Sequence, residues 1–350
     1  MTIDLRSDTV TRPTAAMLER MRTAELGDDS RDGDPTVQAL EALAAERTGK
    51  DAGLFVASGT MGNVVALLTH SGRGGEVLCD SGVHMLRSEM GGIASVAGLF
   101  FRTLPSHRGA VDLEALAEAL SPRLTPTRLG TGLVWMETSH NDAGGAVLPL
   151  AHMKAVYDLA AVHGVPVHVD GARLFNAACA LGVDARTVAA HADSVMFCVS
   201  KGLSAPVGSL LVGSRDFITR ARGFRRMIGG ALRQAGVIAA AGIVALEDMV
   251  DRLPEDHRMA RRLAAGLAAI DPSLTDPERV ETNIVRIDVT GSCHNAGQWT
   301  GALAAQDVLA GAWNRRQIRC VTHRHIGPAD IDRTLTAFAE TWQAFRALER

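Results

Sequence analysis

The chain has 350 residues, which is enough for one large domain with its own core and a second, smaller domain. Apolar residues make up 47% and charged residues 21%, as in ordinary globular proteins, and the formal net charge of −3 gives no overall attraction to nucleic acid or to an anionic membrane. The five cysteines are odd in number and form no C-x-x-C pair, so we expect neither a disulfide framework nor a metal site, and a reducing compartment.

No targeting or membrane segment is expected. The chain begins MTIDLRSDTV, with charges at once and no apolar stretch, which is not the pattern of a secretory signal. The longest apolar run, VIAAAGIVAL at 237–246, is too short to span a bilayer. We therefore expect a cytoplasmic protein with no nucleic-acid or membrane partner.

The first 250 residues alternate helices with short apolar strands. Asp34 and Pro35 are typical of an N-cap and a first helical residue, and the helical spacing of TVQALEALAAERTG stops at Gly49. AGLFVASGT then predicts a strand that runs into a turn, and MGNVVALLTH predicts a helix. Further strand candidates are EVLCD, GLVWM, VPVHVD, DSVMFCV and GSLLVG, with helical stretches between several of them. This alternation predicts a mostly parallel sheet covered by helices on both faces.

The pattern changes near residue 250. A helix DHRMARRLAAGLAAI precedes the strand NIVRIDV, and a helix around 298–309, the strand QIRCVTH and a helix from Pro328 follow. Such a segment has the size of a small α+β domain of about a hundred residues. We therefore expect an α/β protein with a large domain at 1–250, including an N-terminal arm, and a small C-terminal α+β domain at 251–350.

Two side chains that follow predicted strands can carry chemistry. Asp170 ends VPVHVD, and ligands of parallel sheets bind beyond the carboxyl ends of the strands. It either caps the next helix or holds a pyridinium nitrogen, which keeps a cofactor ring electron-poor. Lys201 follows DSVMFCV among small turn residues, so its amine is predicted to face a cleft and to act as a Schiff-base nucleophile. The two residues are about one β-α-β unit apart and can reach one cleft.

A turn rich in small residues, SGTMGN at 58–63, lies between a predicted strand and a predicted helix. Its free amides and the helix dipole make either a phosphate seat or an ordinary βα turn. Gly72, Gly74 and Gly75 precede a strand instead of following one, so the dinucleotide fingerprint is not met. This argues against a nicotinamide cofactor.

Other charged residues keep two interpretations each. His84, just after EVLCD, is either structural or stacked on a flat cofactor with a role in proton transfer. Arg173 and Arg319 are either surface ion pairs or clamps for a carboxylate. The densest basic stretch is predicted to be a solvated helix face. It comprises Arg215, Arg220, Arg222, Arg225 and Arg226.

Taken together, these segments resemble the low-specificity L-threonine aldolases of the aspartate-aminotransferase structural superfamily. The resemblance runs from LRSDTVTRP near residue 5 to RCVTHRHIGPADID near residue 332. The segments between them occur in the family's order. They include FVASGTMGN, HMLRSEMGG, SHNDAGGAVLPL, HVDGARLFNA, SVMFCVSKGLSAPVGS and RRMIGGALRQAG.

The resemblance implies the type I fold of the transferases that depend on pyridoxal 5′-phosphate, and implies pyridoxal 5′-phosphate as the cofactor. It implies retro-aldol cleavage of L-threonine, L-allo-threonine or a related β-hydroxy-α-amino acid to glycine and an aldehyde. Lys201 would carry the cofactor as a Schiff base, Asp170 would hold its pyridine nitrogen, and His84 would stack on its ring.

Further implied roles concern the cofactor's surroundings, the substrate and the assembly. Ala172 would lie beneath the ring and Arg173 beside it, while Gly59 and Thr60 would bind the phosphate. The substrate carboxylate would be held by Ser7, Arg173 and Arg319. The family assembles as homodimers or homotetramers with shared active sites, so Arg233 would reach the phosphate from a neighbouring subunit, and the segment 215–233 would have an interface role.

Three departures from the family pattern leave the β-hydroxyl base unnamed. Arg31 stands where the family usually has a tyrosine, and Ser88 where an aromatic residue is common. A histidine often found upstream of the strand that holds Glu137 is missing from RLTPTRLGTG. His84 or an ordered water are the candidates that remain.

Two alternatives stay open at the level of sequence. A related enzyme with the same cofactor, such as a glycyl transaldolase, a β-eliminating lyase or an aminotransferase, would use the same lysine and aspartate, because fold does not fix chemistry. A cofactor-binding protein that has lost catalysis is the other. The presence of Lys201, Asp170 and both arginines argues against it.

Overall fold

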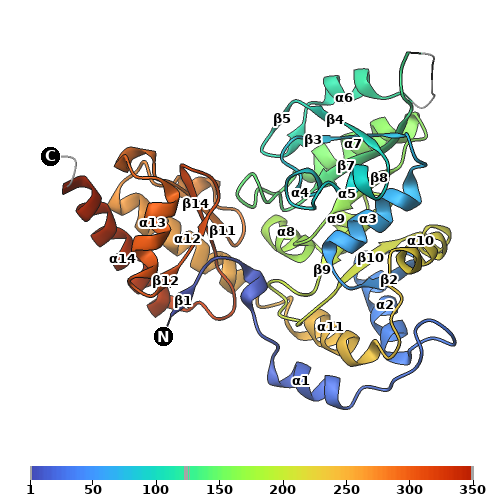
Figure 1. Cartoon of the computed structure of the whole chain (residues 1–350), viewed down its shortest axis with the longest axis horizontal. Helices are drawn as coiled ribbons and strands as arrows, with labels where there is room; N and C mark the ends of the chain where they lie inside the picture. The colour runs from blue at the N-terminus through green and yellow to red at the C-terminus, as the bar shows by residue number, and fades with distance from the viewer. Residues whose placement is uncertain (1, 122–124, 126, 348–350) are drawn as a thin grey trace. The chain divides into compact units, whose positions relative to one another are not determined.

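The computed structural model describes residues 2–121, 125 and 127–347. It divides into two compact units (Figure 1). The large unit comprises residues 12–143 and 147–250, and the C-terminal unit comprises residues 1–11, 144–146 and 251–350. Residues 1–11 therefore belong with the C-terminal residues, whereas the sequence placed them with the large domain as an arm.

The large unit is built on a central sheet. Among the described residues, seven strands form it in the order β2 (Ala52–Val56), β10 (Ser209–Gly213), β9 (Ser194–Cys198), β8 (Val167–Asp170), β7 (Thr131–Glu137), β3 (Glu76–Asp80) and β4 (Phe100–Leu104). From β9 to β4 every pairing is parallel, and β10 alone runs antiparallel to both of its neighbours. This confirms the mostly parallel central sheet.

The helices of the large unit follow the predicted alternation with the strands. They are α1 (Ala15–Arg22), α2 (Pro35–Thr48), α3 (Gly59–His70), α4 (His84–Arg87), α5 (Gly92–Ser95), α6 (Leu113–Ala119), α7 (Leu150–Val162), α8 (Leu174–Leu181), α9 (Ala185–Ala189), α10 (Arg215–Met227) and α11 (Gly236–Asp248). Helix α1 packs on α11. A short hairpin of β5 (Ser106–His107) and β6 (Ala110–Val111) follows β4. The Asp34 carboxylate caps α2, and Gly49 ends it in the left-handed region at φ 66°, as the sequence predicts.

The alternation of side chains along β2 shows how both faces of the sheet are buried. Leu54 and Val56 pack in one apolar cluster with residues of α3 and α10. On the other face, a Cβ added at Gly53 would lie 2.5 Å from the Glu41 carbonyl of α2. Helix α2 therefore lies directly on the strand, and the sheet is enclosed between α3 and α10 on one side and α2 on the other.

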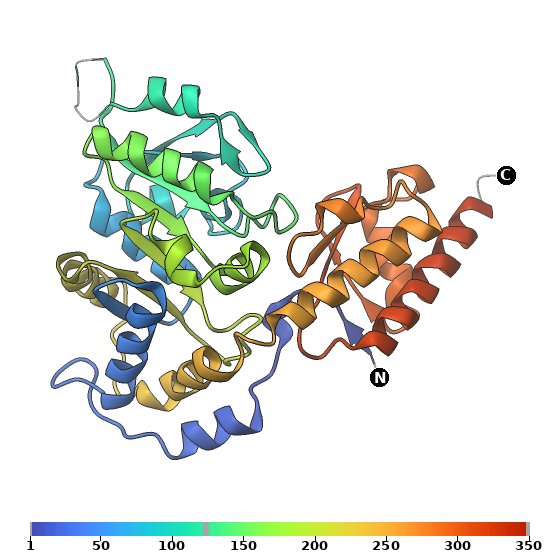
Figure 2. The same cartoon turned by 180° about the vertical axis from the view of Figure 1, so that it is seen from behind.

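The C-terminal unit has its own core around Trp299 and Phe338. Its elements are β1 (Ile3–Asp4), η1 (Asp8–Val10), α12 (Leu253–Ile270), η2 (Pro277–Arg279), β11 (Ile284–Asp288), η3 (Thr290–Ser292), α13 (Ala296–Ala304), β12 (Val308–Leu309), β13 (Gly311–Ala312), β14 (Gln317–Val321) and α14 (Pro328–Ala347). Strand β14 pairs antiparallel with β11 and β13, and α12 and α14 lie side by side (Figure 2).

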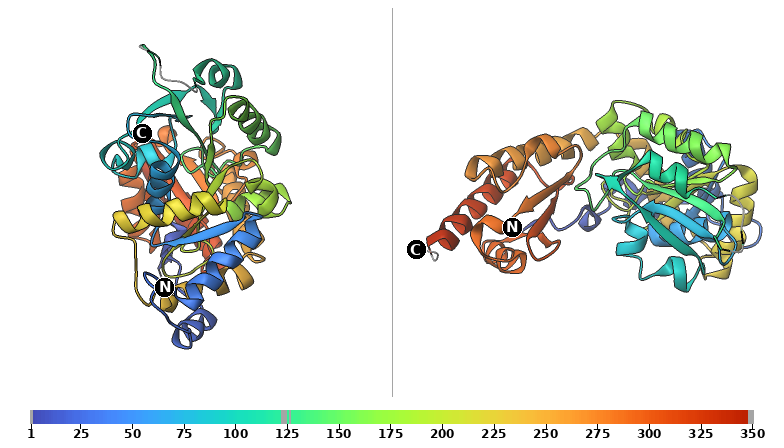
Figure 3. Two further views of the ribbon diagram at one scale, coloured as in Figure 1. Left: turned by 90° about the vertical axis from the view of Figure 1, so that its right-hand side faces the viewer. Right: turned by 90° about the horizontal axis from the view of Figure 1, so that it is seen from above.

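The N-terminal strand completes this unit. β1 pairs in parallel with β12 and lies among the C-terminal elements (Figure 3). The Leu5 carbonyl accepts a hydrogen bond from the Val321 amide at 2.8 Å, which joins the same segment to β14. The helix expected at 298–309 is shorter than predicted, because its last residues form β12 and pair with β1. Within the described residues, no helix combines the length and the apolar character that crossing a membrane needs.

Candidate active site

Three neighbouring parallel strands end on an acidic residue. Asp80 ends β3, Glu137 ends β7 and Asp170 ends β8, and all three side chains are buried. Glu137 and Asp170 are register partners. Because parallel strands present their carboxyl ends at one edge, the acids gather where parallel sheets bind ligands. Lys201 lies three residues beyond β9, the next strand along this edge.

Asp170 is held by two hydrogen bonds, one on each carboxylate oxygen. Oδ1 accepts from the Ala172 amide at 3.0 Å, and Oδ2 accepts from Nδ2 of Asn63 at 2.8 Å. The aspartate is 1% exposed. Asp170 does not cap α8, since the N-cap residue is Arg173, which has no side-chain cap bond. The buried carboxyl group is thus fixed at the strand end by two neutral donors.

His84 begins α4 and is held beside Asp170. Its Nδ1 lies 2.7 Å from Oε1 of Glu89, a buried residue between α4 and α5. The same Oε1 accepts from Nδ2 of Asn63 at 2.8 Å. Ligand atoms of His84, Glu89 and Asp170 all lie within 4.8 Å of one another. Helix α3, the segment from His84 to Glu89 and the end of β8, which are distant in the sequence, therefore meet at one point.

The pKa values of two groups at this edge, His84 and Glu137, are both raised, but for different reasons. The hydrogen bond to Glu89 raises the pKa of His84 against the effect of burial, and the charges of Asp170 and Glu137 add to it. Burial raises the pKa of Glu137 itself. Glu137 accepts from the amides of His84 at 2.6 Å and Asn141 at 2.8 Å, so it anchors the start of α4.

The first turn of α3 offers backbone amides. Ser58 is the N-cap, and its hydroxyl accepts from the Met61 amide at 3.2 Å. The amides of Gly59 and Thr60 occupy the first two helical positions, which have no partner within a helix. A Cβ added at Gly59 would lie 3.1 Å from Sγ of Cys198 at the end of β9. Glycine therefore lets the helix start approach the strand that leads to Lys201, as expected for an anion seat.

Lys201 is the lysine that the fold brings to this edge. The chain has three lysines. Nζ of Lys50 donates to the Ala192 carbonyl at 2.6 Å, before β9 begins, and Lys154 pairs with Asp158 on the exposed surface of α7. Lys201 lies half-buried in a turn closed by the Ser204 amide on its carbonyl at 2.8 Å.

A family model described as beta-eliminating lyase matches residues 4–290. The chain is 41% identical over 97% of its length to low-specificity L-threonine aldolase 1 of Arabidopsis thaliana, covering 96% of that protein. It is 40% identical to the low specificity L-threonine aldolase of Escherichia coli K12, over 99% of both chains. The chain belongs to the low-specificity L-threonine aldolase family. The resemblance stated from the sequence is thus confirmed.

Solved structures of this fold agree. A structure described as Leishmania major threonine aldolase matches with a TM-score of 0.82 at 16% identity, covering 97% of this chain and 99% of that one. A serine palmitoyltransferase of Sphingomonas wittichii matches with a TM-score of 0.76 at 17% identity, covering 99% and 88%. At these identities the likeness establishes the α/β fold, and the fold class predicted from the sequence is confirmed.

The remaining predicted site residues in the large unit are placed as follows. Ala172 follows Asp170 and donates its amide to it, and Arg173 is buried at the start of α8. Arg233 is exposed and lies 3.7 Å from the Asp28 carboxylate, so loops 27–33 and 229–235 of this family member are joined. The roles of these residues toward a ligand stay predictions.

Two predicted substrate residues lie in the C-terminal unit. The Ser7 hydroxyl accepts from the Thr9 amide at 3.2 Å and caps η1. Arg319 extends from β14, donates from Nη2 to the Arg6 carbonyl at 3.1 Å and lies 4.9 Å above the Trp313 ring. Their roles toward a substrate stay predictions.

The departures from the family pattern fall at the surface. Arg31 is 80% exposed in its side chain, and Ser88 is exposed at the end of α4. Of the segment RLTPTRLGTG, which lacks the family's histidine, residues 123, 124 and 126 lie outside the described residues.

The basic stretch differs from its prediction. Arg225 is buried, with Nη2 at 2.7 Å from Asp29 and Nη1 donating to the Phe55 carbonyl at 2.8 Å. Arg222 pairs with Glu41 at 2.7 Å. The prediction of a solvated helix face is therefore wrong for Arg225, because loop 27–33 supplies a carboxylate to that side of α10, whereas the Arg222 side chain is 41% exposed.

A second acid–imidazole pair at this edge was missed by sequence reasoning. Nε2 of His140 lies 2.9 Å from Oδ1 of Asp80, and its Nδ1 accepts from the Ala143 amide at 3.1 Å. Burial alone would lower the pKa of His140, but the Asp80 bond and the nearby acids raise it. Despite burial, bonds from His140, Ser106 and the Gly82 amide lower the pKa of Asp80 to about 2. The segment SHNDAGG carried the signal.

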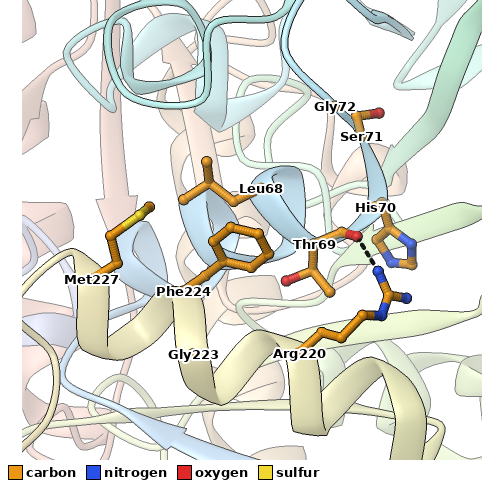
Figure 4. Close-up of a pocket in the computed structure, with 9 residues that line it drawn as sticks. All are labelled: Leu68, Thr69, His70, Ser71, Gly72, Arg220, Gly223, Phe224 and Met227. Carbon is orange, nitrogen blue, oxygen red and sulfur yellow. Dashed lines mark hydrogen bonds between the residues drawn. The ribbon is translucent and has the colours of Figure 1, made fainter.

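A pocket of about 570 Å³ in the large unit lies away from this edge (Figure 4). It is lined by Leu68, Phe224, Met227 and the end of α3, and Nη1 of Arg220 donates to the Thr69 carbonyl at 2.7 Å. His70 and Ser71 precede β3, so the pocket belongs to the amino ends of the strands. The pocket and the three strand-end acids therefore lie at opposite ends of the central sheet.

Proposed function

We propose that this chain is a pyridoxal-phosphate-dependent lyase that cleaves the Cα–Cβ bond of L-threonine, L-allo-threonine or a related β-hydroxy-α-amino acid, giving glycine and an aldehyde. The observation that carries the proposal is that the buried Asp170 ends β8 and Lys201 follows the adjacent strand β9 by three residues. Membership of a family whose relatives are named for threonine aldolase activity supports it.

The donor set fits the proposed cofactor. A pyridine ring needs an anion at its nitrogen, and Asp170 is a buried carboxylate whose bonds to Asn63 and Ala172 come from neutral donors. A phosphate needs amides at a helix start, and α3 begins with Gly59 in a close contact that a side chain would fill. An aldehyde needs an amine, which Lys201 supplies.

The chain's own residues would then act as follows. When bound, pyridoxal phosphate supplies an electron sink for the charge left at Cα. Asp170 would keep the ring nitrogen protonated, and the buried Arg173 would turn the substrate by its carboxylate so that the Cα–Cβ bond can break. Ser7 and Arg319 are assigned to the same carboxylate by the family resemblance alone.

His84 is our candidate for the group that takes the β-hydroxyl proton. Glu89 holds its Nδ1, which leaves Nε2 to accept and return the proton. The hydrogen bond to Glu89 raises the pKa of His84, which makes the neutral ring a stronger base toward that proton. This choice does not require the family's missing histidine.

The assembly and location are also part of the proposal. We assign a homodimer or homotetramer with shared sites in the cytoplasm. The exposed Arg233 would serve the phosphate of a neighbouring subunit, which the exposure of its side chain supports. The family resemblance supports the assembly, and the composition supports the compartment.

The decisive test is chemical labelling of Lys201. Protein incubated with pyridoxal phosphate and reduced with borohydride should carry the label on the Lys201 peptide, while Lys201→Ala should stay unlabelled and inactive. Lys154→Ala is the matched control and should behave like wild type, because its amine pairs with Asp158 on the surface. Label found on Lys50 or Lys154, or none, would overturn the proposal.

The reaction itself is tested with L-threonine and L-phenylserine supplied separately. Glycine and the matching aldehyde should form in equal amounts. A keto acid or ammonia as the main product would instead favour transamination or β-elimination with the same cofactor.

A further inference from the structure

One hydrogen-bonded chain joins His84, which is assigned to the face of the cofactor ring, to Asp170, which is assigned to the ring nitrogen. It runs from Nδ1 of His84 to Oε1 of Glu89 at 2.7 Å, and from that oxygen to Nδ2 of Asn63 at 2.8 Å. It ends on Oδ2 of Asp170, also 2.8 Å from the Asn63 nitrogen. Asn63 and Glu89 are 0% and 5% exposed, so water does not compete for these bonds.

The geometry assigns Asn63 a specific task. An amide nitrogen carries two hydrogens, and here each is donated to a different carboxylate. Its Oδ1 is buried and has no partner among the described residues. A buried acceptor left unpaired costs free energy, so the orientation is held by the two carboxylates and not by the oxygen. Asn63 thus holds the two carboxyl groups close together at the ring site.

Glu89 has a corresponding task toward His84. A histidine on a helix of four residues has little to fix its ring, and the bond to Glu89 sets both its orientation and the position of its proton. Three carboxylates face His84: Glu89 after α4, Asp170 of β8 and Glu137 of β7. Of these, Glu89 contributes most to raising the pKa of the ring.

We propose that Asn63 and Glu89 are positioning residues that join His84 and Asp170 into one hydrogen-bonded unit. Both residues that recognise the cofactor ring are then held in place before the cofactor binds. The proposal rests on the function given above for its cofactor. It adds that the site is organised by two residues that would not themselves touch the substrate. Disturbing either one should therefore alter its distant partner as well as its neighbour.

The test uses Asn63→Leu, which keeps the number and branching of the side-chain heavy atoms and removes both donors, and Glu89→Gln, which keeps the shape and removes the charge. Thr69→Val is the matched control, because Thr69 is buried on the same helix and its hydroxyl bonds only within α3, to the Val65 carbonyl. Pyridoxal-phosphate affinity would be measured by fluorescence titration, and the His84 pKa by NMR in the cofactor-free protein.

We expect the cofactor Kd to rise about tenfold or more in both variants and to stay unchanged in Thr69→Val. The His84 pKa should fall by about one unit in Glu89→Gln and should also fall in Asn63→Leu, which is not its direct neighbour. The double variant should bind about as weakly as the weaker single variant, since both substitutions break one chain.

Unchanged affinity and an unchanged His84 pKa in both variants would overturn the inference. Strictly additive losses in the double variant would overturn the single unit, leaving two separate contacts. If Asn63→Leu does not fold by circular dichroism, Asn63→Ser takes its place with the same expectations. Wild type that binds no pyridoxal phosphate would refute the proposed function, whereas the His84 titration in the cofactor-free protein would still decide this inference.

Discussion

The pKa values of the histidines at the two ends of the central sheet are shifted in opposite directions. At the carboxyl end, His84 and His140 each face a carboxylate, from Glu89 and Asp80, and their pKa values are raised. At the amino end, His70 bonds the Ser194 hydroxyl at 2.6 Å and stacks on Phe217, and burial lowers its pKa to about 3.

A neighbouring histidine extends the contrast. Nδ1 of His168 lies 2.7 Å from the same Ser194 oxygen, and burial lowers the pKa of His168 well below its usual value. The two amino-end rings are therefore neutral packing groups that share one hydroxyl. Residue type alone does not mark a site; the difference lies in whether the ring bonds a carboxylate or a hydroxyl group.

The largest expected effect separates the aspartates at the two ends. Asp170→Asn removes the carboxylate that we propose to hold the ring nitrogen, so kcat/KM should fall by at least about a hundredfold. Asp193→Asn is the matched substitution at the amino end, where Oδ2 accepts from the Val167 amide at 2.7 Å. It should leave the rate within about twofold. Steady-state kinetics with L-threonine checks both, and equal losses would remove the functional contrast between the two ends.

The second prediction concerns acid stability. A pKa lowered in the folded state contributes stability that is present above the unfolded value near 6.5 and is lost as the pH falls. His70 should therefore cost about 1.4 kcal/mol at pH 5.5 relative to alkaline pH. His70→Gln should remove this part of the slope in urea unfolding between pH 7.5 and 5.5. An unchanged slope would show that His70 has the same pKa in the folded and the unfolded protein.

The smallest expected effect sharpens the contrast at the carboxyl end. Asp80→Asn leaves His140 buried but takes away its charged partner, so burial should then lower the His140 pKa. Folding stability should fall by about 0.5–1.5 kcal/mol, because one charge-assisted hydrogen bond becomes neutral. NMR titration and urea unfolding measure the two effects. A His140 pKa that stays raised would assign the effect to Glu137 and Asp142 instead.

Local signals in the sequence predicted much of the fold. Asp34 and Gly49 bound α2 as expected, because capping depends on residues a few positions apart. Lys201 and Asp170 were found from the ends of apolar strands, since parallel strands bring their carboxyl ends together. The antiparallel direction of β10 was not predicted, because nothing local in GSLLVG sets the direction of a strand.

Side-chain pairing across elements could not be predicted. Asn63 lies inside the helix MGNVVALLTH, where its burial suggests packing, and only the tertiary fold places it between Glu89 and Asp170. Glu89 follows His84 by five residues, a spacing that a regular helix would not bring together. The turn after α4 does so. The sequence therefore predicted which candidate residues lie at the strand ends, but not the hydrogen bonds that join them to Asn63 and Glu89.

The pairing of β1 with β12 sets an order of events during synthesis. Ile3 aligns with Val308 and Asp4 with Leu309, so the first strand made has to wait for nearly the last. Until residue 309 has left the ribosome, Leu5 has neither of its backbone partners, at Leu309 and Val321. Such a distant closure slows folding, and the large unit can form meanwhile. In a nascent chain stopped before β12, β1 would therefore lack its strand partner, although all seven strands of the large unit's sheet have been made.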